Sequence, residues 1–550
     1  MAPAVKSTDL FDASDFLKRE GPGLLRSFIR SHRNAVFADL RFEAMFSRSA
    51  SATDGEARSA QEGESAGFSV SVRVDERSGA LGRGASGTGA SGTGASGTGQ
   101  TGVEVGRLAL RPGRLVAAIR AALAEAYERA RLSAREKAAL IRALGGNPAA
   151  AARVRSLLGA PLAPRAAVHD RIAAVFRRDP RALAPGELSR LCREASARVA
   201  ALGSVIAFNA VAAFSELREE VFAGSDGTLI SQGFAFSQGD CYIVAQNGDG
   251  HQEIYDTIGQ QRGLECLSDG WRGELMPNPD LGTFALELAN EARELAAAPV
   301  LKPPEAEVTV VTDPHFNALV AHEIIGHPSE ADRALKMEAA YAGRSWFLRS
   351  LDNNEVGHQV GSPLMSACSD PGLDGYGQYR YDHEGTRARR VMHVEKGVFR
   401  GFLNSRETAA VLGVEPNGSA RASEVFYVPL IRMSNTFLMP GESDPQRIIA
   451  DVEHGYYVCG CAVPSIAESR ENFRISARRV YEIDHGRLGR LYRAGSVIAD
   501  SKDFFMNVDA VGNDLRLIAI PNCGKGQPMQ VKRMSNGGPT LRSRARLGGG

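Results

Sequence analysis

Residues 307–332 of the chain read EVTVVTDPHFNALVAHEIIGHPSEAD. The first five positions, 307–311, are typical of a strand. Asp313 is a suitable N-cap and Pro314 a suitable first helical residue, so we expect a helix to begin directly after the strand. Apolar side chains at positions 316, 319, 320 and 324 fit one buried stripe of that helix. His322 and Glu323 then fall in its third turn.

The two histidines of this stretch are five residues apart, in the pattern His-Glu-x-x-x-His. On a regular α-helix five residues rotate a side chain by about 140°, against about 40° for four. A continuous helix would therefore aim His322 and His327 at different faces. Gly326 weakens a helix, and Pro328 disfavours the α conformation at His327. We therefore expect the helix to unwind or bulge here, so that His327 turns back towards His322.

Two histidines beside a glutamate are typical of a zinc site, and a catalytic zinc ion usually has three protein ligands. Cys523 lies in a glycine-rich loop near Lys525, which favours the thiolate and allows close approach, so it ranks narrowly first by chemistry. The spacing alone does not choose the third ligand, and its candidates are two carboxylates and three cysteines: Glu330, Asp332, Cys459, Cys461 and Cys523.

Seven blocks of the second half of the chain carry a resemblance: HEIIGHPSEAD (322–332), YDHEG (381–385), RMSNT (432–436) with PG (440–441), GYYVCG (455–460), VGND (511–514), CGK (523–525) and GPTL (538–541). In content and order these blocks resemble the TldD/PmbA family of zinc metalloproteases. The resemblance covers residues 300–550 specifically. Strands expected at 36–46 and 68–74 look like the N-terminal strands of the family, whereas residues 112–215 match it only loosely.

The resemblance implies that His322, His327 and Cys523 hold one Zn²⁺ per chain and that Glu323 is catalytic. It also implies an N-terminal α/β domain and a β-rich C-terminal domain. Family members form dimers, either of one chain or with a paralogue that lacks the motif, and they cleave unfolded peptides, including leader segments. Because this chain retains the motif, it resembles the active, TldD-type subunit.

Our first hypothesis is accordingly a zinc-dependent peptidase in which Glu323 is the general base and returns the proton to the leaving amine. Glu330 and Asp332 are candidates for orienting an imidazole. The oxyanion needs a further polar group, and the candidates are Tyr381, His383 and Arg432.

Two departures from the family pattern bear on the substrate. Asp382 and His383 stand where the family usually has two acids, so a role for the second acid is in doubt. Residues 461–465, Cys-Ala-Val-Pro-Ser, replace a run of glycines. If that run shapes the peptide channel, the substrate preference of this chain differs from that of its relatives.

The order of elements predicts an α+β fold in three parts. Residues 1–111 contain strands and a Gly/Ser/Thr linker at 84–102, residues 112–300 are helical (to about 214) and then mixed, and residues 301–550 form a β-rich, mostly antiparallel metalloprotease domain. An amphipathic helix is expected at 280–298.

Composition narrows the function class. The formal charge of +1 over 550 residues gives no field that would attract nucleic acid or an anionic membrane. We see no membrane span and no secretory signal, and seven cysteines are too few and too odd for a disulfide framework, so we expect a cytoplasmic protein. Two rivals remain: a non-catalytic peptide-binding or regulatory subunit with a structural zinc, and an effector of DNA gyrase, which the charge disfavours.

Overall fold

The computed structural model describes residues 8–75, 96–106, 110–144, 147, 150, 162–184, 186–341, 343–351 and 353–549. Its helices and mostly antiparallel sheets make an α+β fold, as the sequence predicts. No helix within these ranges combines the length and the apolar character that crossing a bilayer requires.

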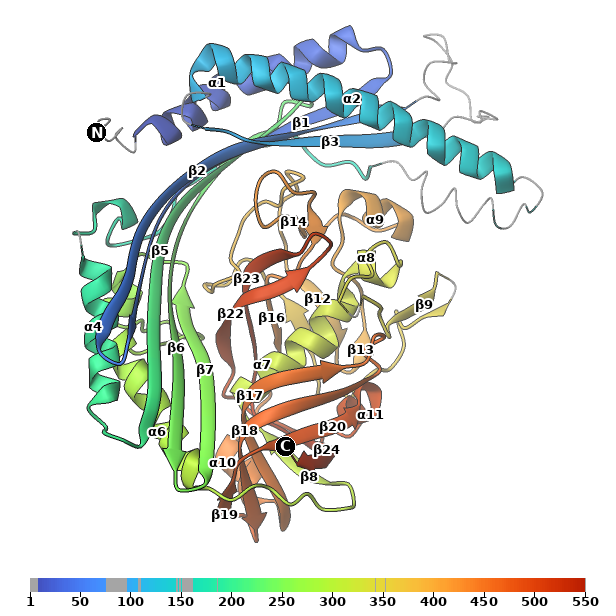
Figure 1. The fold of residues 1–550 in the computed structure, drawn as a ribbon. Helices are drawn as coiled ribbons and strands as arrows, with labels where there is room; N and C mark the ends of the chain where they lie inside the picture. The colour runs from blue at the N-terminus through green and yellow to red at the C-terminus, as the bar shows by residue number, and fades with distance from the viewer. Residues whose placement is uncertain are drawn as a thin grey trace.

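The N-terminal half is built on one seven-stranded sheet of order β3-β2-β1-β5-β6-β4, with β7 paired to β6. Its long strands bend into an arch, and the C-terminal half lies on the concave side of that arch (Figure 1). The strands are β1 (Ala35–Thr53), β2 (Glu56–Asp75), β3 (Ser96–Glu104), β4 (His169–Ile172), β5 (Ile206–Gly224), β6 (Leu229–Asn247) and β7 (Gly250–Gln260).

Helices cover the convex side of the arch at both of its ends (Figure 1). α6 begins after the N-cap Asp280, which confirms the predicted amphipathic helix. The helices of this half are α1 (Thr8–Ser31), α2 (Pro112–Ala143), the short η3 (Pro180–Ala182), α4 (Glu187–Ala200), α5 (Glu265–Ser268) and α6 (Leu281–Ala297).

The predicted linker at 84–102 is wrong for its last part. Residues 84–95 lie outside the described residues, but Ser96–Glu104 is strand β3, which α2 covers. A Cβ added at Gly97 would lie 2.0 Å from the carbonyl oxygen of Ala130, and one at Gly99 would lie 2.0 Å from that of Ala126. These glycines therefore let the helix backbone rest directly on the strand.

The helical prediction for 112–214 is wrong at His169–Ile172, which is strand β4, and again from Ile206 onward, where β5 begins. Asn209 is a fully buried residue of this strand. Its side chain accepts a hydrogen bond from the Ser196 hydroxyl at 2.6 Å and donates to the Asp54 carboxylate at 3.1 Å. Sheet pairing on both sides of β5 overrides the helix preference of its alanines.

The C-terminal half holds two larger sheets. One has the order β13-β12-β11-β16-β23-β22 and the other β17-β8-β24-β20-β18-β19, with β21 on β24. Their strands are β8 (Val308–Thr312), β11 (Ala367–Ser369), β12 (Val391–Glu395), β13 (Val398–Phe399), β16 (Asn435–Leu438), β17 (His454–Ile466), β18 (Asn472–Asp484), β19 (Arg487–Tyr492), β20 (Gly495–Asp500), β21 (Ala510–Val511), β22 (Arg516–Lys525), β23 (Gln530–Gly538) and β24 (Leu541–Gly549).

Short elements complete this half around one large apolar core, which also takes in the helix after β8. They are two hairpins, β9 (Leu348–Ser350) with β10 (Asn353–Asn354) and β14 (Ala420–Arg421) with β15 (Leu430–Ile431), and the helical segments α7 (Pro314–Val320), η4 (Ala321–Gly326), η5 (His327–Ser329), α8 (Ala331–Ala334), α9 (Arg406–Leu412), α10 (Pro445–Ala450) and α11 (Ser501–Met506).

The sheets bear on the expected division of the chain. The strands before and after residue 111 belong to the same sheet, so a boundary there would cut through it. Every strand of the two larger C-terminal sheets follows residue 300. We therefore propose two domains, 1–300 and 301–550, in place of three.

Candidate metal centre

The predicted strand and helix are present, and the helix changes its winding where the histidines lie. The Asp313 carboxylate accepts a hydrogen bond from the Phe316 amide at 2.7 Å and caps α7. The chain then widens into the π turn η4 and tightens into the 3₁₀ turn η5. As a result the rings of His322 and His327 have their centroids 4.7 Å apart with their planes at 88°. The predicted departure from a regular helix is thus confirmed.

The cause of that departure differs from our expectation. His327 keeps α-helical angles, with φ −61° and ψ −44°, although Pro328 follows it. The extra residue is taken up earlier, in the π turn, which closes hydrogen bonds over a longer span than an α turn. The Trp346 indole donates to the carbonyl of Ile324 in that turn at 3.1 Å. Gly326 is required by packing, because a Cβ there would lie 1.9 Å from the Met433 sulfur.

One of the five candidates for the third ligand lies with the two histidines. Ligand atoms of His322, His327 and Cys523 are all within 4.8 Å of one another, and the Cys523 sulfur is 3.5 Å from His327 Nε2. All three residues are buried. Cys461 instead contacts His315, and no other candidate joins this group among the described residues. Two imidazoles and a thiolate are donors that Zn²⁺ prefers, so the residues present fit the ion.

Each imidazole is oriented through its Nδ1 atom. His322 Nδ1 is 2.8 Å from the Asn536 side-chain oxygen, and His327 Nδ1 is 3.0 Å from the Glu330 carboxylate. Nε2 of each ring is then left to bind a metal ion, as in metal sites where a hydrogen bond to Nδ1 fixes the tautomer. Glu330 therefore lies within hydrogen-bonding distance of an imidazole. Asn536 was missed, since a single asparagine more than 200 residues away in the chain carries no local signal.

Asp332 does not contact an imidazole, so its predicted role is wrong. Its carboxylate is 2.7 Å from the Lys525 ammonium, which also lies 3.0 Å from Glu330. Lys525 is fully buried and pairs with both acids, and the Arg333 guanidinium also lies 3.0 Å from Glu330. Lys525 therefore does not favour the Cys523 thiolate as we expected; burial opposes that charge, and the two histidines and Arg432 hold the pKa of Cys523 well below its usual range.

Glu323 lies at the partly exposed edge of this group. Burial disfavours its charge, but Arg470 and then His322 lower the pKa of its carboxyl to about 2. Arg470 binds the Glu323 carboxylate directly and follows β17 in the loop to β18. Sequence reasoning did not find Arg470, because the contact joins the π turn η4 to a loop residue 147 positions away in the chain.

The three residues considered for the oxyanion are engaged elsewhere. The Tyr381 hydroxyl donates to Asp170 at 2.8 Å, and His383 Nε2 lies 3.1 Å from Glu220. Arg432 is fully buried and donates to the carbonyl oxygens of Cys523 and Gln530. The oxyanion role is therefore wrong for Arg432, because its guanidinium is used to hold the β22–β23 hairpin.

Comparison with known proteins places this centre in a family. Residues 305–546 match the family model described as the PmbA/TldA metallopeptidase C-terminal domain. A metalloprotease of Methanothermobacter thermautotrophicus is 34% identical over 330 residues, which is 60% of this chain and 67% of that protein. The zinc metalloprotease TldD homolog of Saccharolobus solfataricus is 25% identical over 335 residues, 60% of this chain and 69% of that protein.

The likeness extends to the whole fold. The crystal structure of TldE from Thermococcus kodakarensis superposes with a TM-score of 0.65 at 15% identity, covering 98% of this chain and 100% of that one. At this identity the superposition shows the fold alone. Taken with the sequence matches to named metalloproteases, it leads to one assignment: this chain belongs to the TldD/PmbA family of metalloproteases.

Proposed function

We propose that this chain is a zinc-dependent peptidase that hydrolyses peptide bonds in unfolded or short peptides, such as leader segments. His322, His327 and Cys523 would hold one Zn²⁺ per chain, and Glu323 would be the catalytic residue. The observation that supports this most is the convergence of those three donor atoms within 4.8 Å, next to a carboxylate that is partly exposed. Metalloprotease names among its relatives agree with this reading.

The chemistry follows from the residue types. Zn²⁺ bound in such a site acts as a Lewis acid and brings the pKa of a water ligand towards about 7. The Glu323 carboxylate accepts a proton from the attacking water and carries it to the nitrogen of the leaving amine. Asn536 and Glu330 fix the two imidazole rings, so the donor atoms need no reorganisation.

Glu323 distinguishes the peptidase from the rival hypothesis, a binding subunit with a structural zinc. A structural zinc site needs no base beside its ligand. The test is to measure cleavage of an unfolded peptide library and the zinc content for the wild type and for Glu323→Gln. We expect the variant to keep its zinc and to lose at least about a hundredfold in kcat/KM. Glu468→Gln, which removes an exposed carboxylate that pairs with Arg344, is the control. Equal cleavage by Glu323→Gln would remove Glu323 as the base.

We also propose that the protein works as a dimer in the cytoplasm, either with a second copy or with a paralogue that lacks the His-Glu-x-x-x-His motif. The likeness to TldE over nearly the whole chain supports this, because a TldE chain and this relative of TldD share one fold. Light scattering of the chain alone and with a co-expressed paralogue would distinguish the two assemblies. A monomer under both conditions would contradict the proposal.

A further inference from the structure

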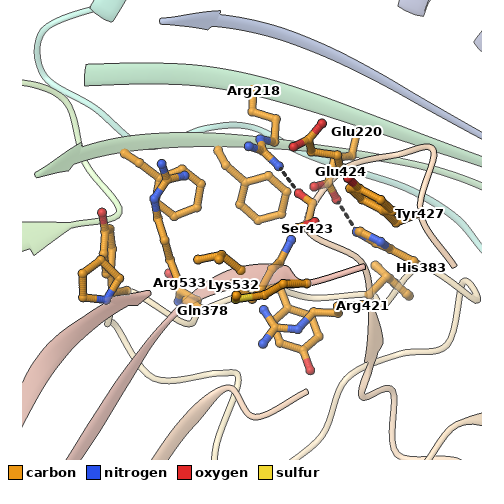
Figure 2. A pocket seen from close by; sticks show the side chains of 18 residues that line it. Arg218, Glu220, Gln378, His383, Arg421, Ser423, Glu424, Tyr427, Lys532 and Arg533 are labelled. Carbon is orange, nitrogen blue, oxygen red and sulfur yellow. Dashed lines mark hydrogen bonds and ion pairs between the residues drawn. The ribbon is translucent and has the colours of Figure 1, made fainter. Parts of the chain in front are cut away.

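A cavity of about 300 Å³ lies between the arched sheet and the C-terminal half (Figure 2). It adjoins the candidate metal centre, since Cys523 pairs with Lys532 across the β22–β23 ladder and Lys532 lines the cavity. Partners in such a ladder have Cα atoms only about 5 Å apart. A peptide bound at the metal centre could therefore place a neighbouring side chain, or its end, in this cavity.

Two cations of the cavity, Arg421 and Lys532, have no carboxylate partner among the residues that the structure describes. Arg421 is 5% exposed; its guanidinium stacks on the Tyr379 ring at 4.2 Å and donates to the Met433 carbonyl, but its Nε has no hydrogen-bond partner. The Lys532 ammonium has one hydrogen bond, to the carbonyl of Ala422 at 2.8 Å. Burial lowers the pKa of Lys532 to about 7, although the nearby carboxylates of Glu220 and Glu43 favour its charge.

The other charged groups of the cavity are largely satisfied by one another. Arg218 pairs with Glu216 at 2.9 Å and with Glu43 at 3.1 Å, and Arg533 pairs with Glu216 at 3.2 Å. Glu220 is hydrogen-bonded to His383 and forms no ion pair with Lys532, and Glu424 is exposed to solvent. Arg421 and Lys532 are therefore the cations of the cavity without a direct carboxylate contact among the described residues, although Glu220 acts on both at longer range.

Unpaired buried cations are costly, and a carboxylate that pairs with them removes that cost. We propose that this cavity is a substrate subsite in which Arg421 and Lys532 bind a carboxylate of the peptide, either an acidic side chain or the C-terminal carboxylate. The proposal rests on the proposed peptidase function. Aromatic side chains supply an apolar wall for the rest of the bound residue: Phe234, Phe236 and Tyr376.

The subsite can be tested by binding, without cleavage. The experiment uses one peptide in three forms: free C-terminal acid, C-terminal amide, and amide with one glutamate. The peptide is one that the wild type cleaves or, if none is found, an unfolded peptide rich in alanine. The affinities of the three forms for zinc-loaded Glu323→Gln protein are measured by calorimetry. We expect one charged form to bind about tenfold more tightly than the neutral amide. Which charged form it is identifies the source of the carboxylate.

Variants connect that preference to the cavity. Lys532→Met, added to Glu323→Gln, should abolish the preference for the charged peptide, and Lys532→Arg should retain it. Lys502→Met, which removes a more exposed lysine that pairs with Glu355, is the control and should change nothing. If inorganic phosphate binds to the cavity but the charged and neutral peptides bind alike, the cavity is an anion site unrelated to peptides and the proposal is overturned.

The two proposals can fail separately. Cleavage of the free-acid, amide and glutamate-containing peptides with equal kcat/KM would overturn the subsite and leave the peptidase function standing. A Lys532-dependent preference for the charged peptide in a wild-type protein that cleaves no peptide would support the subsite and overturn the peptidase function. Absence of both would overturn both.

Discussion

Arg470 holds Glu323 by two groups at once: its guanidinium binds the side-chain carboxylate and also donates to the main-chain carbonyl of the same residue at 3.0 Å. Arg470 is itself 3% exposed, and its own carbonyl accepts a hydrogen bond from Ser501 at 2.7 Å. The proposed base is thus fixed from the β17–β18 loop rather than from its own helical segment.

Replacing Arg470 should disturb the position of the carboxylate while leaving the metal in place. We expect Arg470→Gln to keep its zinc and to lose about tenfold or more in kcat, because small misplacements of a reacting group are costly. Arg349→Gln is the control, since Arg349 forms an exposed ion pair with Glu471, the next residue along the chain from Arg470. Loss of zinc from Arg470→Gln would instead indicate that Arg470 supports the metal centre as a whole.

The proposed ligand set predicts the metal content. Purified wild-type protein supplied with zinc at neutral pH should contain about one zinc per chain by elemental mass spectrometry. Cys523→Ser should bind much less, whereas Cys192→Ser, which alters a buried thiol of α4, should bind as much as the wild type. Zinc-free wild type would mean that the two histidines and Cys523 do not act together, and the binding-subunit hypothesis would then lead.

The contact between α2 and β3 predicts a large effect from one methyl group. Gly99→Ala would place a Cβ 2.0 Å from the Ala126 carbonyl oxygen, so α2 has to move away from the sheet. We expect a loss of about 2 kcal/mol or more in the free energy of unfolding, measured in urea. Gly113→Ala, in the first turn of the same helix, meets nothing within 4 Å and should cost nothing. Equal stability of both variants would contradict the described contact.

An ion pair between the two halves of the chain should make stability depend on pH. Asp256 of β7 lies 2.8 Å from Arg478 of β18 and 3.5 Å from His315 of α7. Burial opposes its charge, but Arg478 and His315 hold the pKa of the carboxyl well below its usual range. A lowered folded-state pKa stabilises the protein above the unfolded value of about 3.9, and this stabilisation is lost as the pH falls towards the folded value.

We therefore expect Asp256→Asn to be less stable than the wild type by about 3 kcal/mol at pH 7, with a difference that shrinks as the pH falls below about 4. Urea unfolding at a series of pH values measures it. Asp451→Asn removes a surface partner of Arg447 and should change stability by less than about 1 kcal/mol at any pH. A constant difference across the pH range would show that the charge of Asp256 is not the cause.

Local patterns predicted the centre of the site but not its surroundings. The strand, the cap at Asp313 and the change of winding before His327 were all predicted from neighbouring residues, and the structure confirms them, although the winding changes in the π turn and not at Pro328. Cys523 could only be ranked by chemistry, and the family resemblance chose it. Asn536 and Arg470 reach the site through tertiary contacts alone, so no spacing in the sequence predicts them.

The fold was predictable where one face of an element is apolar and the other polar. Alternation revealed β2, whose Phe68, Val70 and Val72 are fully buried. It failed for β5, because alanine, valine and phenylalanine occupy both faces of that strand and resemble a helix-forming run. It failed again at Ser96–Glu104, where glycine signals close contact with α2 instead of a loose chain.

Because of the π turn at Ala321–Gly326, the two histidines of this longer motif lie on one side of the helix, as they do in a motif that is one residue shorter. Removing Ile325 from the chain would leave His-Glu-x-x-His, the spacing that brings two imidazoles to one side of an ordinary α-helix. A single codon inserted or deleted is thus enough to interconvert two linear patterns for the same spatial arrangement. Pattern searches built on only one of these spacings will overlook proteins that use the other.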